Sequence, residues 1–202
     1  YYICYNRDAN ELIVFYVMKN VFDIYNPLGS RINICGGGGK TTLARAISEK
    51  YGHKHIELDS LYWNPGWQPE SDRDFKAKTA LEIGDADHFW VVDGNYTSKL
   101  NDLVLTQCDL VIWLNLPWKV VFWRIVLRCI KRARTKERIC GDNFETWKQM
   151  FSKDSLLLYL IQERKQYINR KDLFLPLISK DVPVLEISST KQLREFYKFH
   201  GL

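Results

Sequence analysis

Two hydrophobic patterns alternate along the chain from residue 31 onward. Short apolar runs predict buried strands at residues 31–35, 55–58, 89–93, 110–115 and 182–187. Longer segments with apolar residues at helical spacing predict helices at residues 41–51, 72–83, 118–132, 144–167 and 191–199. Strands that alternate with helices are typical of a parallel sheet covered by helices on both faces. We therefore expect an α/β fold with a five-stranded parallel sheet.

The first 30 residues stand apart from this pattern. An apolar, β-prone run at residues 12–18 lies between polar clusters, and Asn26-Pro27-Leu28-Gly29-Ser30 has the composition of a linker. We predict an extension of unknown role over residues 1–30 and one domain over residues 31–202. A chain of 202 residues with 46% hydrophobic content can bury one substantial core.

A glycine-rich turn joins the first predicted strand to the first predicted helix. Glycines let consecutive backbone N–H groups point at an anion, and the helix N-terminus adds partial positive charge. Lys40 would reach the β and γ phosphates of a nucleotide, and the Thr41 hydroxyl would ligate Mg²⁺. The predicted nucleotide-binding residues of this phosphate loop are Gly36, Gly37, Gly38, Gly39, Lys40, Thr41 and Thr42.

The phosphate loop is shorter than the usual pattern. The spacing G-x-x-x-x-G-K-[ST] would need a glycine at position 34, where the chain has Ile34. If Gly36 is the first loop glycine, two residues are missing and fewer amides can wrap the β-phosphate. A plain glycine turn and a degenerate protein that binds ATP without catalysis therefore stay open as alternatives.

Two aspartates follow predicted strands, at the edge of the sheet where ligands bind in such folds. Asp93 ends the third predicted strand, and we expect it to hold Mg²⁺ directly or through water. Asp59 follows the second predicted strand and would orient or deprotonate a substrate hydroxyl. The structural alternatives are a turn at Asp93-Gly94 and a helix cap at Asp59.

Arginines recur at a spacing of four in the helix predicted at residues 118–132. Arg124, Arg128 and Arg132 would form one stripe along this helix. The positive charge continues through Lys131, Arg134, Lys136 and Arg138. Phosphoryl transfer needs cations that arrive over the γ-phosphate as water is expelled. We predict a mobile basic lid at about residues 133–143, with a solvated basic face as the alternative.

Composition and charge restrict the function classes. The five cysteines include no C-x-x-C pair, which argues against a zinc site or a disulfide framework and favours the cytoplasm. The most apolar stretch, residues 111–130, contains Pro117 and three basic residues and is a poor membrane span. The net charge of +5 suits an anionic substrate as well as nucleic acid. Trp63 and Trp67 would either stack on a flat substrate or pack their loop against the next helix.

Four segments together resemble a known family. They are Gly36-Gly37-Gly38-Gly39-Lys40-Thr41-Thr42, Leu58-Asp59-Ser60-Leu61-Tyr62-Trp63-Asn64-Pro65-Gly66-Trp67, Val92-Asp93-Gly94-Asn95-Tyr96 and Ile112-Trp113-Leu114-Asn115-Leu116-Pro117-Trp118. The combination resembles the adenylate-kinase-related P-loop proteins labelled DNA topology modulation (FlaR-type) proteins, over about residues 31–197. The resemblance implies a P-loop NTPase three-layer sandwich, a nucleoside-monophosphate-kinase architecture with a small basic lid, and ATP as the donor.

The same resemblance assigns roles to individual residues. Lys40 and Thr41 match the phosphate and magnesium positions, and Asp93 matches the aspartate after the third strand. Ser189 follows the fifth predicted strand, where related kinases pass backbone along the adenine. The predicted catalytic residues are Lys40, Asp59, Arg128, Arg132 and Arg134. The predicted acceptor-binding residues are Asp59, Trp63, Trp67 and Asn95.

The sequence thus predicts a kinase that uses ATP and Mg²⁺ and phosphorylates a nucleotide or a small hydroxyl-bearing metabolite. The rival is a nucleic-acid-binding regulator, suggested by the family label and by the basic residues 124–138. Recognised helix-turn-helix, zinc-finger and RNA-binding signatures are absent from the sequence. A GTPase switch has less support because no Asn-Lys-x-Asp sequence occurs.

Overall fold

A computed structural model describes residues 28–100, 102–140, 142–152, 155–162, 164–165, 167 and 182–202. The apolar run at residues 12–18, and nearly all of the predicted extension, lie outside the described residues. Among the helices that are described, none combines the length and the apolar character needed to cross a membrane.

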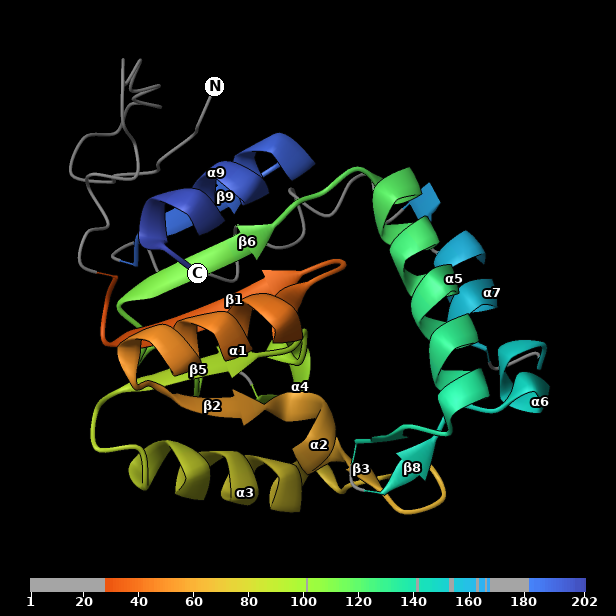
Figure 1. The fold of residues 1–202 in the computed structure, drawn as a ribbon. Helices are drawn as coiled ribbons and strands as arrows, with labels where there is room; N and C mark the ends of the chain where they lie inside the picture. The colour runs from red at the N-terminus through yellow and green to blue at the C-terminus, as the bar shows by residue number, and fades with distance from the viewer. Residues whose placement is uncertain are drawn as a thin grey trace.

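Five parallel strands form the central sheet, as the sequence predicts (Figure 1). Their order across the sheet is β2–β5–β1–β6–β9. Their bounds are Arg31–Gly36 for β1, Lys54–Glu57 for β2, Trp90–Asp93 for β5, Leu110–Leu114 for β6 and Val184–Ile187 for β9. The chain moves from central β1 to one side of the sheet and later crosses to β6 on the other. The phosphate loop therefore lies where the strand order reverses, which is the usual ligand position in such sheets.

Helices cover both faces of the sheet and complete the predicted three-layer fold. One face carries α1 (Lys40–Tyr51) and α9 (Thr190–His200). The other face carries α3 (Asp72–Gly84) and α4 (Thr97–Leu100). Successive residues of β1 point to opposite faces, so Ile34 belongs to the core under α1 and α9, whereas Cys35 belongs to the core under α3 and α4.

A long helix, α5 (Trp118–Thr135), stands away from the sheet beside the carboxyl ends of the strands (Figure 1). Its residues Val121 and Ile125 are buried in the same core cluster as Leu160 of α7 (Leu156–Gln162). Val121 also borders the phosphate loop, because a Cβ atom on Gly38 would lie 3.1 Å from its side chain. The helix therefore forms one wall of a cleft whose other wall is the edge of the sheet.

The prediction of a single helix over residues 144–167 is wrong. The chain instead forms α6 (Trp147–Met150) and then a separate α7. The Thr146 hydroxyl accepts the N–H of the residue three positions on at 3.2 Å, and this capping bond starts α6. The Ser155 hydroxyl accepts the Leu158 N–H at 3.2 Å and starts α7. Ser and Thr side chains that bind backbone amides compete with helix continuation, and the hydrophobic periodicity does not reveal this.

Two short hairpins lie side by side at the end of the cleft (Figure 1). The first hairpin pairs β3 (Trp63–Asn64) with β4 (Gln68–Pro69). The second hairpin pairs β7 (Arg138–Ile139) with β8 (Asn143–Phe144). The predicted lid at about residues 133–143 thus comprises the last residues of α5 and most of the second hairpin.

Candidate active site

The phosphate loop is a tight turn against β6. Gly36, Gly38 and Gly39 have φ angles of 100°, 70° and 128°, which residues other than glycine rarely adopt. A Cβ atom on Gly36 would lie 2.3 Å from the Leu114 carbonyl oxygen. The Gly37 N–H donates to the same oxygen at 3.0 Å. Glycine is therefore required where the chain leaves β1.

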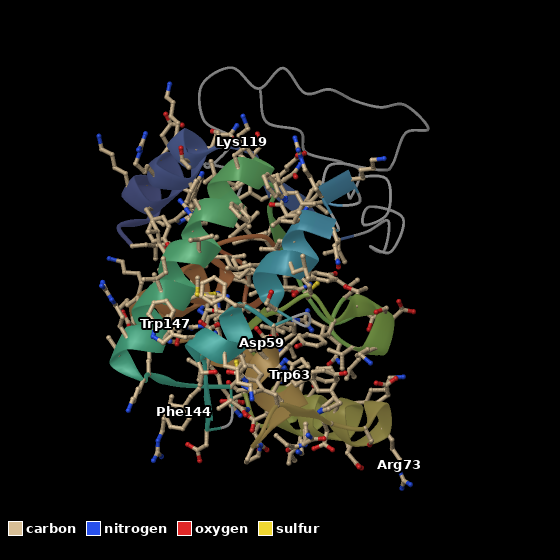
Figure 2. The ribbon with its side chains drawn as sticks, turned by 90° about the vertical axis from the view of Figure 1, so that its right-hand side faces the viewer. Asp59, Trp63, Arg73, Lys119, Phe144 and Trp147 are labelled. Carbon is tan, nitrogen blue, oxygen red and sulfur yellow. The ribbon has the colours of Figure 1, made fainter. Side chains whose placement is uncertain are left out.

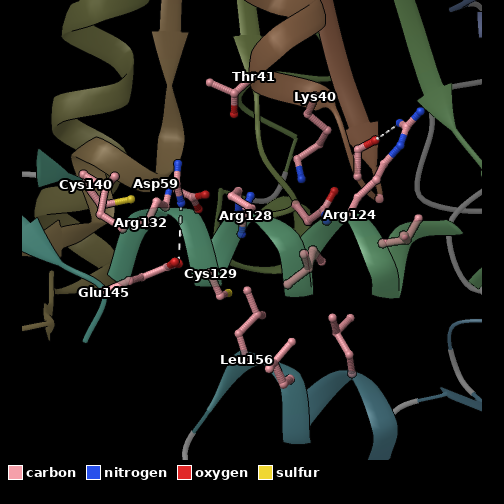
Figure 3. Close-up of a pocket in the computed structure, with 18 of the residues that line it drawn as sticks. Lys40, Thr41, Asp59, Arg124, Arg128, Cys129, Arg132, Cys140, Glu145 and Leu156 are labelled. Carbon is pink, nitrogen blue, oxygen red and sulfur yellow. Dashed lines mark hydrogen bonds and ion pairs between the residues drawn. The ribbon is translucent and has the colours of Figure 1, made fainter. Parts of the chain in front are cut away.

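Helix α1 begins directly after the phosphate loop, at Lys40, without a side-chain cap. Gly39 is the N-cap residue, and no side chain accepts a hydrogen bond there. The Lys40 ammonium lies 3.3 Å from the Gly36 carbonyl oxygen. Figure 3 shows Lys40 and Thr41 extending into the cleft, which Thr42 also lines. Open helix amides beside a lysine form a site for an anion.

A stripe of arginines on α5 faces the phosphate loop across the cleft (Figure 3). Arg124 Nη1 donates to the Gly38 carbonyl oxygen at 2.7 Å, so this arginine already touches the loop. Arg132 pairs with Glu145 at 3.5 Å. Arg128 lies between these two arginines on the helix, exposed to the cleft. The predicted spacing of four therefore brings all three guanidinium groups to the cleft.

Two carboxylates line the opposite side of the cleft. Asp59 lies in the short helix α2 (Leu58–Tyr62), and Glu57 ends β2. The Tyr96 hydroxyl donates to Asp59 Oδ1 at 2.7 Å. Burial, followed by the nearby Asp59 charge, raises the pKa of Tyr96, so its hydroxyl remains a donor at neutral pH. Burial also raises the pKa of Glu57, with further contributions from the charges of Asp93 and Asp59.

Asp93 lies deeper than its predicted metal role suggests. Its side chain is 1% exposed and lies 3.0 Å from His55 Nε2. Among the described residues, Asp93 is not part of the cleft lining, whereas its neighbour in the sheet register, Glu57, is. The sequence analysis missed Glu57. The available signal was a carboxylate at the end of a strand, two residues before Asp59.

The cleft contains a group of side chains that could hold a metal ion. The candidate ligand atoms of Glu57, Asp59 and Cys140 lie within 4.8 Å of one another. Burial, followed by the charges of the two carboxylates, raises the pKa of Cys140 to about 12, so the thiol stays protonated at neutral pH. Mg²⁺ prefers oxygen ligands. The carboxylates and the Thr41 hydroxyl are therefore the better candidates for Mg²⁺ in this cleft.

Asn143 joins the two hairpins. This side chain is buried, with Nδ2 donating to the Asn64 carbonyl oxygen at 2.9 Å. Its Oδ1 accepts the Trp67 N–H at 2.8 Å. We call these two hydrogen bonds of Asn143 the clasp. Because both hairpins line the cleft, the clasp holds together the wall at the end of the cleft nearest Asp59.

The two predicted stacking tryptophans both line the cleft. Trp67 Nε1 donates to the Phe144 carbonyl oxygen at 3.3 Å, so this indole also joins the hairpins. Trp63 stands edge-on to Trp67, with ring centroids 5.8 Å apart. Figure 2, which looks onto α5 and α7, shows Trp63 and Asp59 in the same region of the molecule. Trp67 therefore has a packing role, whereas the Trp63 N–H donates to the Asp59 carbonyl oxygen at the end of α2.

Three other predicted site residues lie in different surroundings. Asn95 lines the cleft and forms two hydrogen bonds with the backbone of Gly36. Ser189 caps α9, where its hydroxyl accepts the Gln192 N–H at 3.1 Å. Arg134 is exposed in the last turn of α5. Neither Ser189 nor Arg134 belongs to the cleft lining as far as the structure describes it.

Comparisons with known proteins place the fold in context. No protein-family model and no curated protein matches the chain. A gluconokinase from Sinorhizobium meliloti is 18% identical, with 85% of this chain and 89% of that chain covered and a TM-score of 0.47. A shikimate kinase from Bacteroides thetaiotaomicron is 17% identical, with 85% and 98% covered and a TM-score of 0.46. A sugar kinase from Janibacter sp. is 16% identical, with 75% and 99% covered and a TM-score of 0.37.

Likeness at this level carries no argument about activity. The fold assignment rests on the sheet, its covering helices and the phosphate loop themselves. The resemblance to FlaR-type proteins stays a prediction from the sequence, since no family model matches.

Proposed function

We propose that this protein transfers a phosphoryl group from ATP to a hydroxyl group of a nucleotide or small metabolite. The observation that carries the proposal is the uncapped start of α1, with Lys40 on it, facing the α5 arginines across the cleft. Backbone amides, an ammonium and guanidinium groups converge there, which suits the charge of a triphosphate. Phosphoryl transfer depends on positioning and on electrostatic stabilisation, and these groups supply both.

The nucleotide would place its β and γ phosphates against the start of α1. The Gly36 and Gly37 amides already have partners within the protein, so the binding amides would come from Gly38 onward. Mg²⁺, when bound, would offset phosphate charge. Its candidate ligands are the oxygens of Thr41 and Glu57, and Asp93 is the neighbour of Glu57 in the sheet register.

Asp59 is the candidate group for the acceptor hydroxyl. Tyr96 holds one oxygen of this carboxylate and leaves the other for an acceptor. A carboxylate at this place can orient the hydroxyl and accept its proton. Arg128 and Arg132 would lie over the transferring group, where negative charge concentrates.

The test is a titration of the purified protein with Mg-ATP by calorimetry, followed by an assay of ADP release with a panel of nucleoside monophosphates and small alcohols. We expect micromolar binding and ADP release that an acceptor stimulates. Lys40→Ala should abolish turnover because it removes the phosphate-binding ammonium. An unchanged steady-state rate in this variant would contradict the role of the loop.

The nucleic-acid-binding alternative makes a different prediction. Arg124, Arg128 and Arg132 line a cleft, which favours a small anionic ligand over a duplex backbone. A regulator that binds DNA through charge would lose affinity steeply with added salt and would not need Mg-ATP. Absence of ATP binding together with salt-sensitive DNA binding would reverse our conclusion.

A further inference from the structure

The end of β1 lacks a neighbouring strand on one side, as far as the described strands extend. Toward β6, Gly36 is in register with Leu114. Toward β5, the register ends where Ile34 pairs with Asp93, and the Gly94 N–H donates to the Ile34 carbonyl oxygen at 3.2 Å. Backbone groups two residues apart on a strand point the same way. The N–H and C=O of Gly36 therefore face the β5 side, beyond the end of β5.

The side chain of Asn95 occupies this place. The Gly36 N–H donates to Asn95 Oδ1 at 2.8 Å. Asn95 Nδ2 in turn donates to the Gly36 carbonyl oxygen at 2.9 Å. A carboxamide offers one acceptor and two donors, so it can serve both backbone groups of one residue at once. The side chain thus does what a longer neighbouring strand would otherwise do.

The same carbonyl group also contacts the lysine of the phosphate loop. Lys40 Nζ lies 3.3 Å from the Gly36 carbonyl oxygen. The direction of this carbonyl is set by the Gly36 peptide group, which Asn95 holds from one side while β6 holds the strand from the other. The position of the ammonium group is therefore linked to Asn95 through the backbone.

We propose that Asn95 is a positioning residue that supports the shortened phosphate loop: it fixes the Gly36 peptide and, through it, Lys40. This inference rests on the proposed function of the loop as a nucleotide site. It differs from the acceptor contact predicted from the sequence, because both ends of the Asn95 amide are bonded to the loop. Asn95 is exposed, so removing its side chain leaves no cavity in the core.

The test compares Asn95→Ala with Thr106→Ala, another polar-to-alanine change at an exposed position, which lies outside the cleft lining. The first measurement is hydrogen exchange of the Gly36 amide, which needs no ligand. We expect Asn95→Ala to speed this exchange about tenfold or more, because the N–H loses its acceptor. The second measurement is calorimetry with Mg-ATP, where we expect a dissociation constant about tenfold higher. Thr106→Ala should change neither value, and both variants should melt close to the parent protein.

Each outcome decides the proposal. Unchanged Gly36 exchange in Asn95→Ala would overturn it. Faster exchange with unchanged Mg-ATP affinity would also overturn it, because the bonds between Asn95 and Gly36 would then have no effect on nucleotide binding. If the parent protein does not bind Mg-ATP, the proposed function fails. The exchange of the Gly36 amide alone then decides whether Asn95 supports the loop. Should Asn95→Ala fail to fold, Asn95→Leu keeps the approximate size of the side chain but loses both the acceptor and the donor, and the same two measurements apply.

Discussion

At the scale of single residues, the pair Asp59–Tyr96 determines what the carboxylate can do. The Tyr96 hydroxyl donates to Asp59 Oδ1 at 2.7 Å. Since burial and the Asp59 charge raise the pKa of Tyr96, this bond persists through the pH range in which kinases are assayed. A carboxylate held at one oxygen offers the other in a fixed direction, which general base catalysis requires.

Asp59→Asn should separate binding from chemistry. We expect Mg-ATP affinity to stay within about twofold of the parent, because the amide keeps the size of the side chain. Turnover should fall by about 10²–10⁴, the usual contribution of a positioned acid or base. Calorimetry and steady-state kinetics measure the two effects. Tyr96→Phe serves as the control and should reduce turnover less, and an equal loss of nucleotide affinity in Asp59→Asn would place Asp59 in the metal shell.

His200 makes stability depend on pH. The ring is buried near the end of α1, with Nδ1 3.1 Å from the Tyr51 hydroxyl and with no hydrogen-bond partner for the buried Nε2 among the described residues. Burial lowers the pKa of His200 in the folded protein. The unfolded chain therefore binds a proton more readily, and the folded state loses stability as the pH falls below the unfolded pKa of about 6.5.

We expect the contribution of His200 to the free energy of unfolding to be nearly constant above about pH 7 and to decrease between about pH 6.5 and pH 5. Urea unfolding at a series of pH values measures this dependence. In His200→Phe the slope over this range should be smaller, whatever the absolute stability. An equal slope in both proteins would assign the pH dependence to other groups.

At the scale of elements, the two hairpins depend on one buried side chain. Asn143 bonds the Asn64 carbonyl oxygen and the Trp67 N–H, which come from the first hairpin. Asn143→Ala leaves both backbone groups without their partner, at a cost of about 1–3 kcal/mol where such groups stay buried. We expect this loss in urea unfolding, together with faster exchange of the Trp67 amide.

The matched control is Asp142→Asn in the same hairpin. Asp142 pairs with Arg138 at 3.3 Å, but the two side chains are 69% and 72% exposed, so the pair contributes at most about 1 kcal/mol. Asparagine also tolerates the positive φ angle of 74° at this position. Equal destabilisation by the two changes would show that Asn143 does not hold the hairpins together.

The elements differ in how well the sequence predicts them. The strands β1 and β6 are recognisable because their apolar runs are short and bounded by turn residues. The break between α6 and α7 was not predicted, although the polar run Ser152-Lys153-Asp154-Ser155 interrupts the apolar pattern there and Ser155 caps α7. The two hairpins were not predicted either, since each strand in them is only two residues long and lacks a periodic pattern.

At the scale of the whole molecule, a ligand that binds only the folded state should stabilise all of it. Mg-ATP at about 100 times its dissociation constant should contribute about 2.7 kcal/mol. For a chain of 202 residues this corresponds to a rise of about 5–10 °C in the melting temperature. Thermal unfolding measures the shift, and Lys40→Ala should lose it. A comparable shift with duplex DNA and none with Mg-ATP would favour the regulator.

Some residues of the candidate site could be predicted from the local sequence, and others could not. Lys40 and Asp59 could be placed in one cleft from the sequence, because each follows a strand and the strands share an edge. The roles of Asn95 and Asn143 depend on contacts between segments far apart in the chain. No spacing rule encodes such contacts, and the folded backbone is needed to identify them.

The clasp at Asn143 has a consequence for how such a protein can change its specificity. Its partners in the first hairpin are backbone atoms, which every amino acid carries. The side chains of both hairpins other than Asn143 and Trp67 can therefore be exchanged, in evolution or in a designed library, while the joint between them persists. Randomising the neighbours of Asn143 while keeping that residue would diversify the acceptor end of the cleft and leave the phosphate end intact.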